Sequence, residues 1–203
     1  MPGGPADRSW PVLETIVFVP LSLHQRLPPF AFMHMARLCP RLREVSTEVP
    51  LAAAELAAAL EGLAPAARTL EALEFSVGDY TDDPPDTDAD TADEEERELG
   101  AAPGAAEALG HLSGLRRLSV GWDRQPGAAA LLASLSAPTL LSSLKLDIGE
   151  WWEGAQPPQA PDLRPGSLRK LALECDDAQH ALHALRAIPR LGGVTNLELT
   201  MSG

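Results

Sequence analysis

The stretches LRRLSV (115–120), LSSLKL (141–146) and LRKLAL (168–173) share one pattern, with apolar residues at the first, fourth and sixth positions. The pattern occurs seven times, and its first members are spaced by 29, 28, 45, 26, 27 and 26 residues. Seven occurrences near one period indicate an internal repeat. The seven sets are Leu13, Ile16 and Phe18; Leu42, Val45 and Thr47; Leu70, Leu73 and Phe75; Leu115, Leu118 and Val120; Leu141, Leu144 and Leu146; Leu168, Leu171 and Leu173; Val194, Leu197 and Leu199.

The segments between these cores are typical of helices. The clearest is 51–63, which is rich in strong helix formers and has Gly62 near its end. Residues 104–112, 127–135 and 176–188 follow three later cores, and Pro189 would end the last of these helices. Each unit is therefore predicted to contain a strand, a turn and a helix. Stacked units of this kind place a parallel sheet on the inside of a curve and the helices outside.

The cores resemble the leucine-rich-repeat family, and the 26–29-residue period is similar to that of its ribonuclease-inhibitor-like and cysteine-containing subfamilies. LCPRLREV (38–45) resembles the lead-in of the cysteine-containing repeats that follow an F-box. The resemblance implies an α/β leucine-rich-repeat solenoid over residues 1–203, with about seven units and a parallel sheet on the concave face. The chain departs from the family where an Asn or Cys is expected eight residues after the first Leu. Those positions hold Leu21, Pro50, Gly78, Asp123, Gly149, Asp176 and Ser202.

The one long spacing coincides with an acidic segment. Residues 79–98 contain eleven acids and one Arg, so they carry −10 of the net charge of −13. DTDAD (86–90) supplies acids at the first three ligand positions of a calcium loop, but Thr91 and Arg97 stand where Gly and Glu are required. Prolines, like charges and few apolar residues instead predict a disordered acidic insertion at about 81–100.

The charge of the other residues is only −3, which gives no electrostatic support for a nucleic-acid or anionic-membrane partner. No run of 18 apolar residues occurs, and the start MPGGPADRSW lacks the features of a signal peptide. Cys39 and Cys175 do not make a disulfide framework, and they are expected not to pair. The sequence therefore predicts an intracellular, cytoplasmic protein.

No motif indicates catalysis, a cofactor or a metal ion. The five histidines are scattered, and His180 and His183, three residues apart on a predicted helix, have no further ligands at zinc-site spacing. The chain contains no Gly-rich phosphate loop, no G-x-S-x-G and no H-E-x-x-H. We therefore expect no enzyme, no catalytic residues, no cofactor and no metal.

Strand side chains alternate, so the variable positions between the pattern residues are expected to line the concave face. Among them, Arg117, Lys145 and Lys170 would form a basic stripe that binds a partner, unless the alternating charges only keep the sheet soluble. Trp122 and Trp152 each follow a strand, and they could add aromatic anchors, which are enriched at protein interfaces.

These features predict a protein–protein interaction scaffold with a partner of unknown identity. The resemblance also leaves open the substrate-recognition part of a larger ubiquitin-ligase receptor, or a GTPase-activating repeat protein that would use Arg117. An inactive truncated fragment is a further alternative. Residues 12–19 are apolar on both faces, and no helix follows the last strand pattern at 194–199. We therefore expect end-to-end self-association or a longer native chain.

Overall fold

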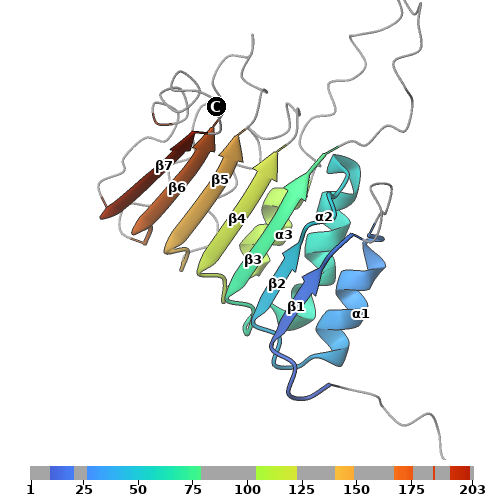
Figure 1. Ribbon diagram of the computed structural model, residues 1–203. Coiled ribbons are helices and arrows are strands. Elements are labelled where there is room, and N and C mark those ends of the chain that lie inside the picture. The colour runs from blue at the N-terminus through green and yellow to red at the C-terminus, as the bar shows by residue number, and fades with distance from the viewer. Residues whose placement is uncertain are drawn as a thin grey trace, which may run out of the picture.

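The computed structural model describes residues 10–20, 27–78, 104–122, 140–148, 167–175, 185 and 193–201. Seven strands within these ranges form one parallel sheet, and their order in the sheet is their order in the sequence (Figure 1). The strands are β1 (Thr15–Phe18), β2 (Glu44–Thr47), β3 (Ala72–Val77), β4 (Arg117–Trp122), β5 (Ser143–Ile148), β6 (Lys170–Cys175) and β7 (Asn196–Met201).

The repeated apolar pattern aligns every strand with its neighbours. Each strand begins two residues after the first pattern residue, and β3 to β7 run two residues beyond the last. The predicted α/β class and the seven predicted strands are confirmed. The second pattern residues form one row of register partners: Ile16, Val45, Leu73, Leu118, Leu144, Leu171 and Leu197.

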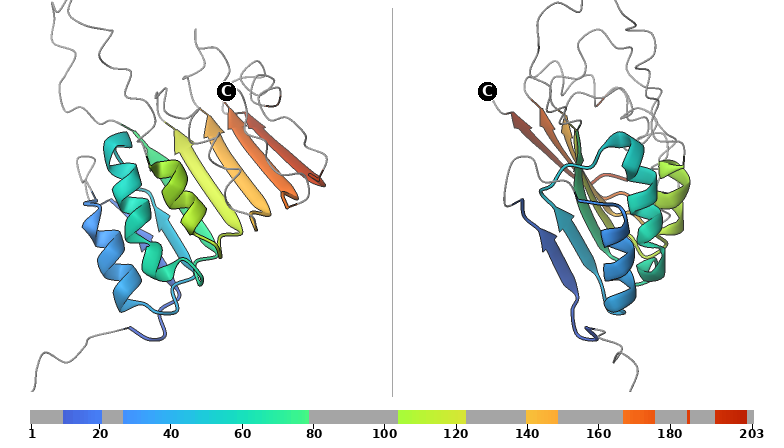
Figure 2. Two further views of the ribbon diagram at one scale, coloured as in Figure 1. Left: turned by 180° about the vertical axis from the view of Figure 1, so that it is seen from behind. Right: turned by 90° about the vertical axis from the view of Figure 1, so that its right-hand side faces the viewer.

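The described helices lie together on one face of the sheet (Figures 1 and 2). The helices predicted at 51–63 and 104–112 are confirmed as α2 and α3, whereas 127–135 and, apart from Leu185, 176–188 lie outside the described residues. No helix in the described ranges is long and apolar enough to cross a membrane. The helical segments are α1 (Phe30–Leu38), α2 (Ala53–Gly62), the 3₁₀ turn η1 (Ala64–Ala66) and α3 (Ala105–His111). We call the opposite face of the sheet the open face.

Helix α1 was not predicted from the repeat. Its sequence, FAFMHMARL, lacks the alanine-rich composition from which α2 and α3 were predicted, although its polar residues His34 and Arg37 stand three apart, as on one face of a helix. Phe32 and Ala36, four residues apart, are its buried side chains, and the Phe32 ring lies 5.7 Å from that of Phe18 on β1. Pro28 and Pro29 directly before the helix were the available signal, because proline is favoured where a helix starts.

Leucine builds the core between the sheet and the helices. Leu118, Leu144 and Leu171 in the central strands are at most 1% exposed, and they belong to one cluster with the buried faces of α1, α2 and α3. Among the described residues, Thr47 at the end of β2 is a buried polar side chain. Its hydroxyl donates to Val49 O at 2.9 Å and accepts from Val49 N–H at 3.0 Å, so its hydrogen-bonding capacity is satisfied without a polar partner in the core.

The backbone hydrogen bonds at the amino ends of the strands repeat from unit to unit. Glu71 O accepts from the amides of both Arg116 and Arg117, at 2.9 Å each. The same pair of bonds to one carbonyl joins all six neighbouring strand pairs, starting with the two amides that donate to Glu14 O. Each strand therefore presents a carbonyl acceptor at the equivalent position to the strand that follows it.

The central leucine row is expected to carry much of the stability. We predict that Leu118→Ala lowers the free energy of unfolding by about 2–5 kcal/mol, because it removes a fully buried side chain and leaves a cavity. The matched control is Leu140→Ala at a side chain that is 51% exposed, for which a change within about 0.5 kcal/mol is expected. Urea unfolding measures both. Equal losses in the two variants would contradict the assignment of the core.

Candidate functional site

Open-face side chains form three rows that cross the strands. Alternate residues of each strand contribute to them, as the sequence analysis predicted. The first row contains Glu44, Ala72, Arg117, Ser143, Lys170 and Asn196. The second contains Ser46, Glu74, Ser119, Lys145, Ala172 and Glu198. The third, at the carboxyl ends of the strands, contains Ser76, Gly121, Asp147, Glu174 and Thr200.

Arg117, Lys145 and Lys170, predicted to bind a partner, lie on the open face of three neighbouring strands. They are staggered, because Arg117 and Lys170 belong to the first row and Lys145 to the second. Each forms an ion pair with a carboxylate of another strand. The structure therefore replaces the expected basic stripe with three charge pairs, in which the cations are already compensated.

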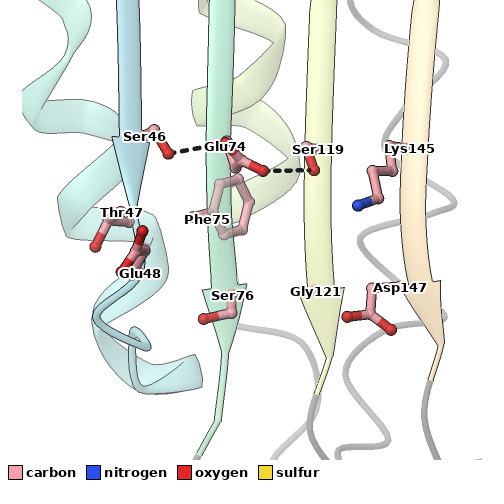
Figure 3. A pocket seen from close by; sticks show the side chains of 10 residues that line it. All are labelled: Ser46, Thr47, Glu48, Glu74, Phe75, Ser76, Ser119, Gly121, Lys145 and Asp147. Carbon is pink, nitrogen blue, oxygen red and sulfur yellow. Dashed lines mark hydrogen bonds between the residues drawn. The ribbon is translucent and has the colours of Figure 1, made fainter. Parts of the chain in front are cut away.

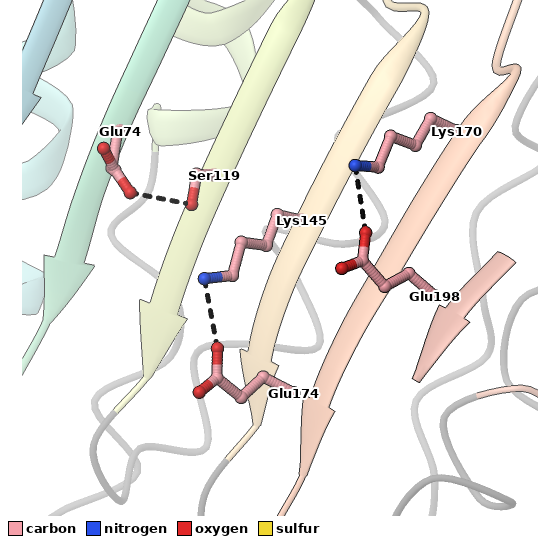
Figure 4. A network of polar contacts seen from close by, with 6 residues as sticks. All are labelled: Glu74, Ser119, Lys145, Lys170, Glu174 and Glu198. Atoms are coloured by element: carbon pink, nitrogen blue, oxygen red, sulfur yellow. Dashed lines mark hydrogen bonds and ion pairs between the residues drawn. The ribbon is translucent and has the colours of Figure 1, made fainter. Parts of the chain in front are cut away.

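The two lysines make the same diagonal pair on successive strands (Figure 4). Lys145 Nζ lies 3.0 Å from Oε2 of Glu174, and Lys170 Nζ lies 2.9 Å from Oε2 of Glu198. Each glutamate is two residues beyond the register partner of its lysine. The hydrogen bond to Glu174 raises the pKa of Lys145, and the hydrogen bond from Lys170 lowers the pKa of Glu198.

Arg117 reaches across a whole strand. Its Nη2 atom lies 3.7 Å from Oε1 of Glu44 on β2, although β3 runs between β2 and β4. Ala72 is the register partner of both residues, and its small side chain leaves the path between them open. The arginine and glutamate side chains are 61% and 42% exposed, so the pair is expected to stabilise the fold by less than about 1 kcal/mol.

The open face is hollowed between β2 and β5 (Figure 3). The hollow has a volume of about 250 Å³. Gly121 has no side chain in the third row, and the space above it is narrow, because an added Cβ would lie 3.3 Å from the Cβ of Ser76 and 3.9 Å from that of Asp147. The hollow is lined by Ser46, Thr47, Glu48, Glu74, Phe75, Ser76, Ser119, Gly121, Lys145 and Asp147.

Glu74 on β3 is held between the two neighbouring strands (Figure 3). Its Oε2 accepts a hydrogen bond from Ser46 Oγ at 2.8 Å, and its Oε1 accepts one from Ser119 Oγ at 3.3 Å. The two hydroxyls fix the direction of the carboxylate, and the Glu74 side chain remains exposed to solvent. A fixed, exposed carboxylate is suited to accept a further hydrogen bond from a cation.

Carboxylates outnumber cations on this face. Around Lys145, the charges of Glu174, Asp147 and Glu74 all raise the lysine pKa, so one cation has three anions as neighbours. In the described strands and the residues directly after them, six acids face three bases. The acids are Glu44, Glu48, Glu74, Asp147, Glu174 and Glu198, and the bases are Arg117, Lys145 and Lys170.

The sequence analysis also singled out two tryptophans, an acidic insertion and two cysteines. The backbone of Trp122 ends β4, whereas Trp152 and the predicted insertion at 81–100 lie outside the described residues. Cys39 and Cys175 are both buried and are not joined by a disulfide. Burial raises the pKa of the Cys39 thiol. Within the described ranges, no group of three or more His, Cys, Asp and Glu is placed to hold a metal ion.

Comparison of the chain with protein-family models, with curated proteins and with solved structures finds no match. What sequence reasoning missed is the set of carboxylate partners. Their types were visible at the variable positions, but the diagonal pairing depends on the register between strands.

The ion pair between Lys170 on β6 and Glu198 on β7 predicts a lowered pKa of the Glu198 carboxyl. NMR titration of the Glu198 carboxyl should give a value below the ordinary 4.5, and Lys170→Gln should return it toward 4.5. Because the pKa is lower in the fold than in the unfolded chain, the pair stabilises the fold above the unfolded pKa. That contribution is lost as the pH falls through the folded pKa. Arg169→Gln is the control for a neighbouring charge. A Glu198 pKa that is not lowered in the wild type would contradict the ion pair with Lys170.

Proposed function

We propose that this protein is a leucine-rich-repeat solenoid that acts as a binding scaffold and recognises a basic segment of a protein partner through its open face. Two observations support the repeat architecture. One apolar register row crosses all seven strands, and one pair of backbone hydrogen bonds recurs at the start of each successive strand. Units that repeat both features stack in the manner that the sequence resemblance implies.

The surplus of carboxylates on the open face carries the proposal for the partner. The three bases are each engaged with an acid, so a partner does not meet an uncompensated positive surface. It meets instead Glu74, Asp147 and Glu48, which line the hollow together with one lysine. Potentials at interfaces are complementary, and a negative face therefore selects a positive segment.

The shape of the face suits an extended or helical segment that lies across the strands. Six strand spacings of about 4.8 Å make the sheet roughly 29 Å wide. A lysine or arginine of the partner would enter the hollow between β2 and β5. Its charged group would then lie near Glu74 and Asp147, on either side of β4.

Several such contacts are needed, because one exposed charge pair contributes only about 0.2–1 kcal/mol. The chain's net charge of −13 adds a long-range attraction that accelerates encounter with a basic partner. Both effects weaken with salt, since the Debye length falls to about 8 Å at physiological ionic strength. Affinity for the partner is therefore expected to fall as the salt concentration rises.

The proposal predicts that a basic probe binds to the open face. The probe is a peptide of alternating Arg and Gly, compared at low salt with a peptide of alternating Glu and Gly. In ¹⁵N-labelled protein, the basic peptide should shift the amides around Glu74, Ser119 and Asp147, and the acidic peptide should not. The double variant Glu74→Gln, Asp147→Asn should bind the basic peptide several-fold more weakly, given about 0.2–1 kcal/mol for each charge removed.

The matched control is the double variant Glu61→Gln, Glu107→Gln, which removes two exposed charges from α2 and α3 on the opposite side of the sheet. All of these variants keep the acidic segment 79–98, so its attraction for the peptide is common to them. Equal losses in the double variant and the control would show attraction by net charge alone. Shifts confined to residues on the helical side, or tighter binding of the acidic peptide, would also overturn the proposal.

A further inference from the structure

We infer that copies of this chain associate head to tail, with the outer edge of β7 in one copy pairing in parallel with the outer edge of β1 in the next. These are the two edge strands of the sheet (Figure 1). The inference does not depend on the proposed function, because it uses the edges of the sheet and the helical side of β7, and the open face remains available. The occupant that it assigns to β7 is a second copy of the chain.

The helical side of β7 is an apolar surface that is half exposed. Leu197, Leu199 and Met201 are 46%, 47% and 60% exposed. Their register partners on β6 are Leu171, Leu173 and Cys175, which are at most 2% exposed. The sequence analysis placed Leu197 and Leu199 in the core. The rows of Leu197 and Leu199 are thus buried from β2 to β6 and exposed at β7, which is the condition of an edge that a further strand would cover.

The backbone shows which strand would fit. At every strand pair, one carbonyl accepts from the two amides at the start of the following strand. The equivalent carbonyl at β7 belongs to Thr195, whose own amide already donates to Arg169 O at 2.9 Å. The equivalent amides at β1 belong to Glu14 and Thr15, because Glu14 O accepts from the first amides of the β2 unit. The outer edges of β7 and β1 therefore repeat the two halves of the joint that is found six times within the chain.

The side chains match in the same register. Placing Asn196 beside Thr15 of the second copy brings Leu197 and Leu199 into the rows of Ile16 and Phe18. Phe18 already packs on α1 through Phe32, so a helix of the second copy would stand beside the exposed side of β7.

A contact between two different edges is heterologous, and each added copy again presents a free β7 edge. We therefore expect open chains of copies whose length rises with concentration. In sedimentation velocity of the full chain over a concentration series, the weight-average sedimentation coefficient should rise beyond that of a monomer. A constant monomer value up to the highest concentration would overturn the inference.

Two variants each block one edge. Leu199→Lys places a charge on the apolar side of β7, and Thr15→Pro removes a donor from the outer edge of β1, where proline is tolerated. Each variant alone should be monomeric. An equimolar mixture should form a one-to-one dimer, because Leu199→Lys retains the β1 edge and Thr15→Pro retains the β7 edge. Thr15→Pro that still associates alone would indicate pairing of two β7 edges and would contradict the parallel joint.

The matched control is Leu140→Lys, which makes the same change at another exposed leucine. This variant should associate as the wild type does, and loss of its association would show an effect of charge alone. Circular dichroism melting checks that each variant is folded. If Leu199→Lys does not fold, Met201→Lys replaces it in the same experiment, because Met201 lies on the same side of β7 and is more exposed.

Discussion

One row of apolar side chains crosses all seven strands at the same register position, from Ile16 to Leu197, and the remaining structure depends on it. The described helices lie on the face of the sheet to which this row belongs, behind β1 to β4. Because strand side chains alternate, the residues on either side of the row must face the other way. A slip of one residue at any joint would place leucines on the open face and charges in the core. The apolar row therefore fixes the open face as well as the core.

That constraint explains why the open face is at once polar and internally paired. Parallel strands in register bring like positions of successive units side by side, and an ion pair formed in one unit can recur in the next. Lys145 with Glu174 and Lys170 with Glu198 repeat one diagonal geometry in this way. Each base of the open face is engaged with an acid, and carboxylates outnumber bases there. The proposed preference for a basic partner follows from this excess of negative charge. The edges of the sheet follow from the same regularity, since each is half of the joint that the chain uses between its own units.

The strands, their order and the faces of their side chains could be predicted because they are set by local alternation and by the repeat period. The helices α2 and α3 could be predicted from their alanine-rich sequences. Helix α1 was not predicted, because FAFMHMARL lacks this alanine-rich composition, although His34 and Arg37 stand at helical spacing. The charge pairs could not be predicted either. The pair of Arg117 and Glu44 depends on two side chains that meet above Ala72. The residue types at single positions do not show which side chains of different strands come into contact.

The most direct test of the account is to detect the joints between strands through their hydrogen bonds. NMR scalar couplings across hydrogen bonds link an amide nitrogen to the carbonyl carbon that accepts from it. We expect couplings from Arg117 N to Glu71, from Ser143 N to Arg116, and from Lys170 N to Ser142, matching N–O distances of 2.9–3.0 Å. Couplings that join these amides to other strands, or that show antiparallel pairing, would contradict the sequential parallel sheet on which every proposal rests.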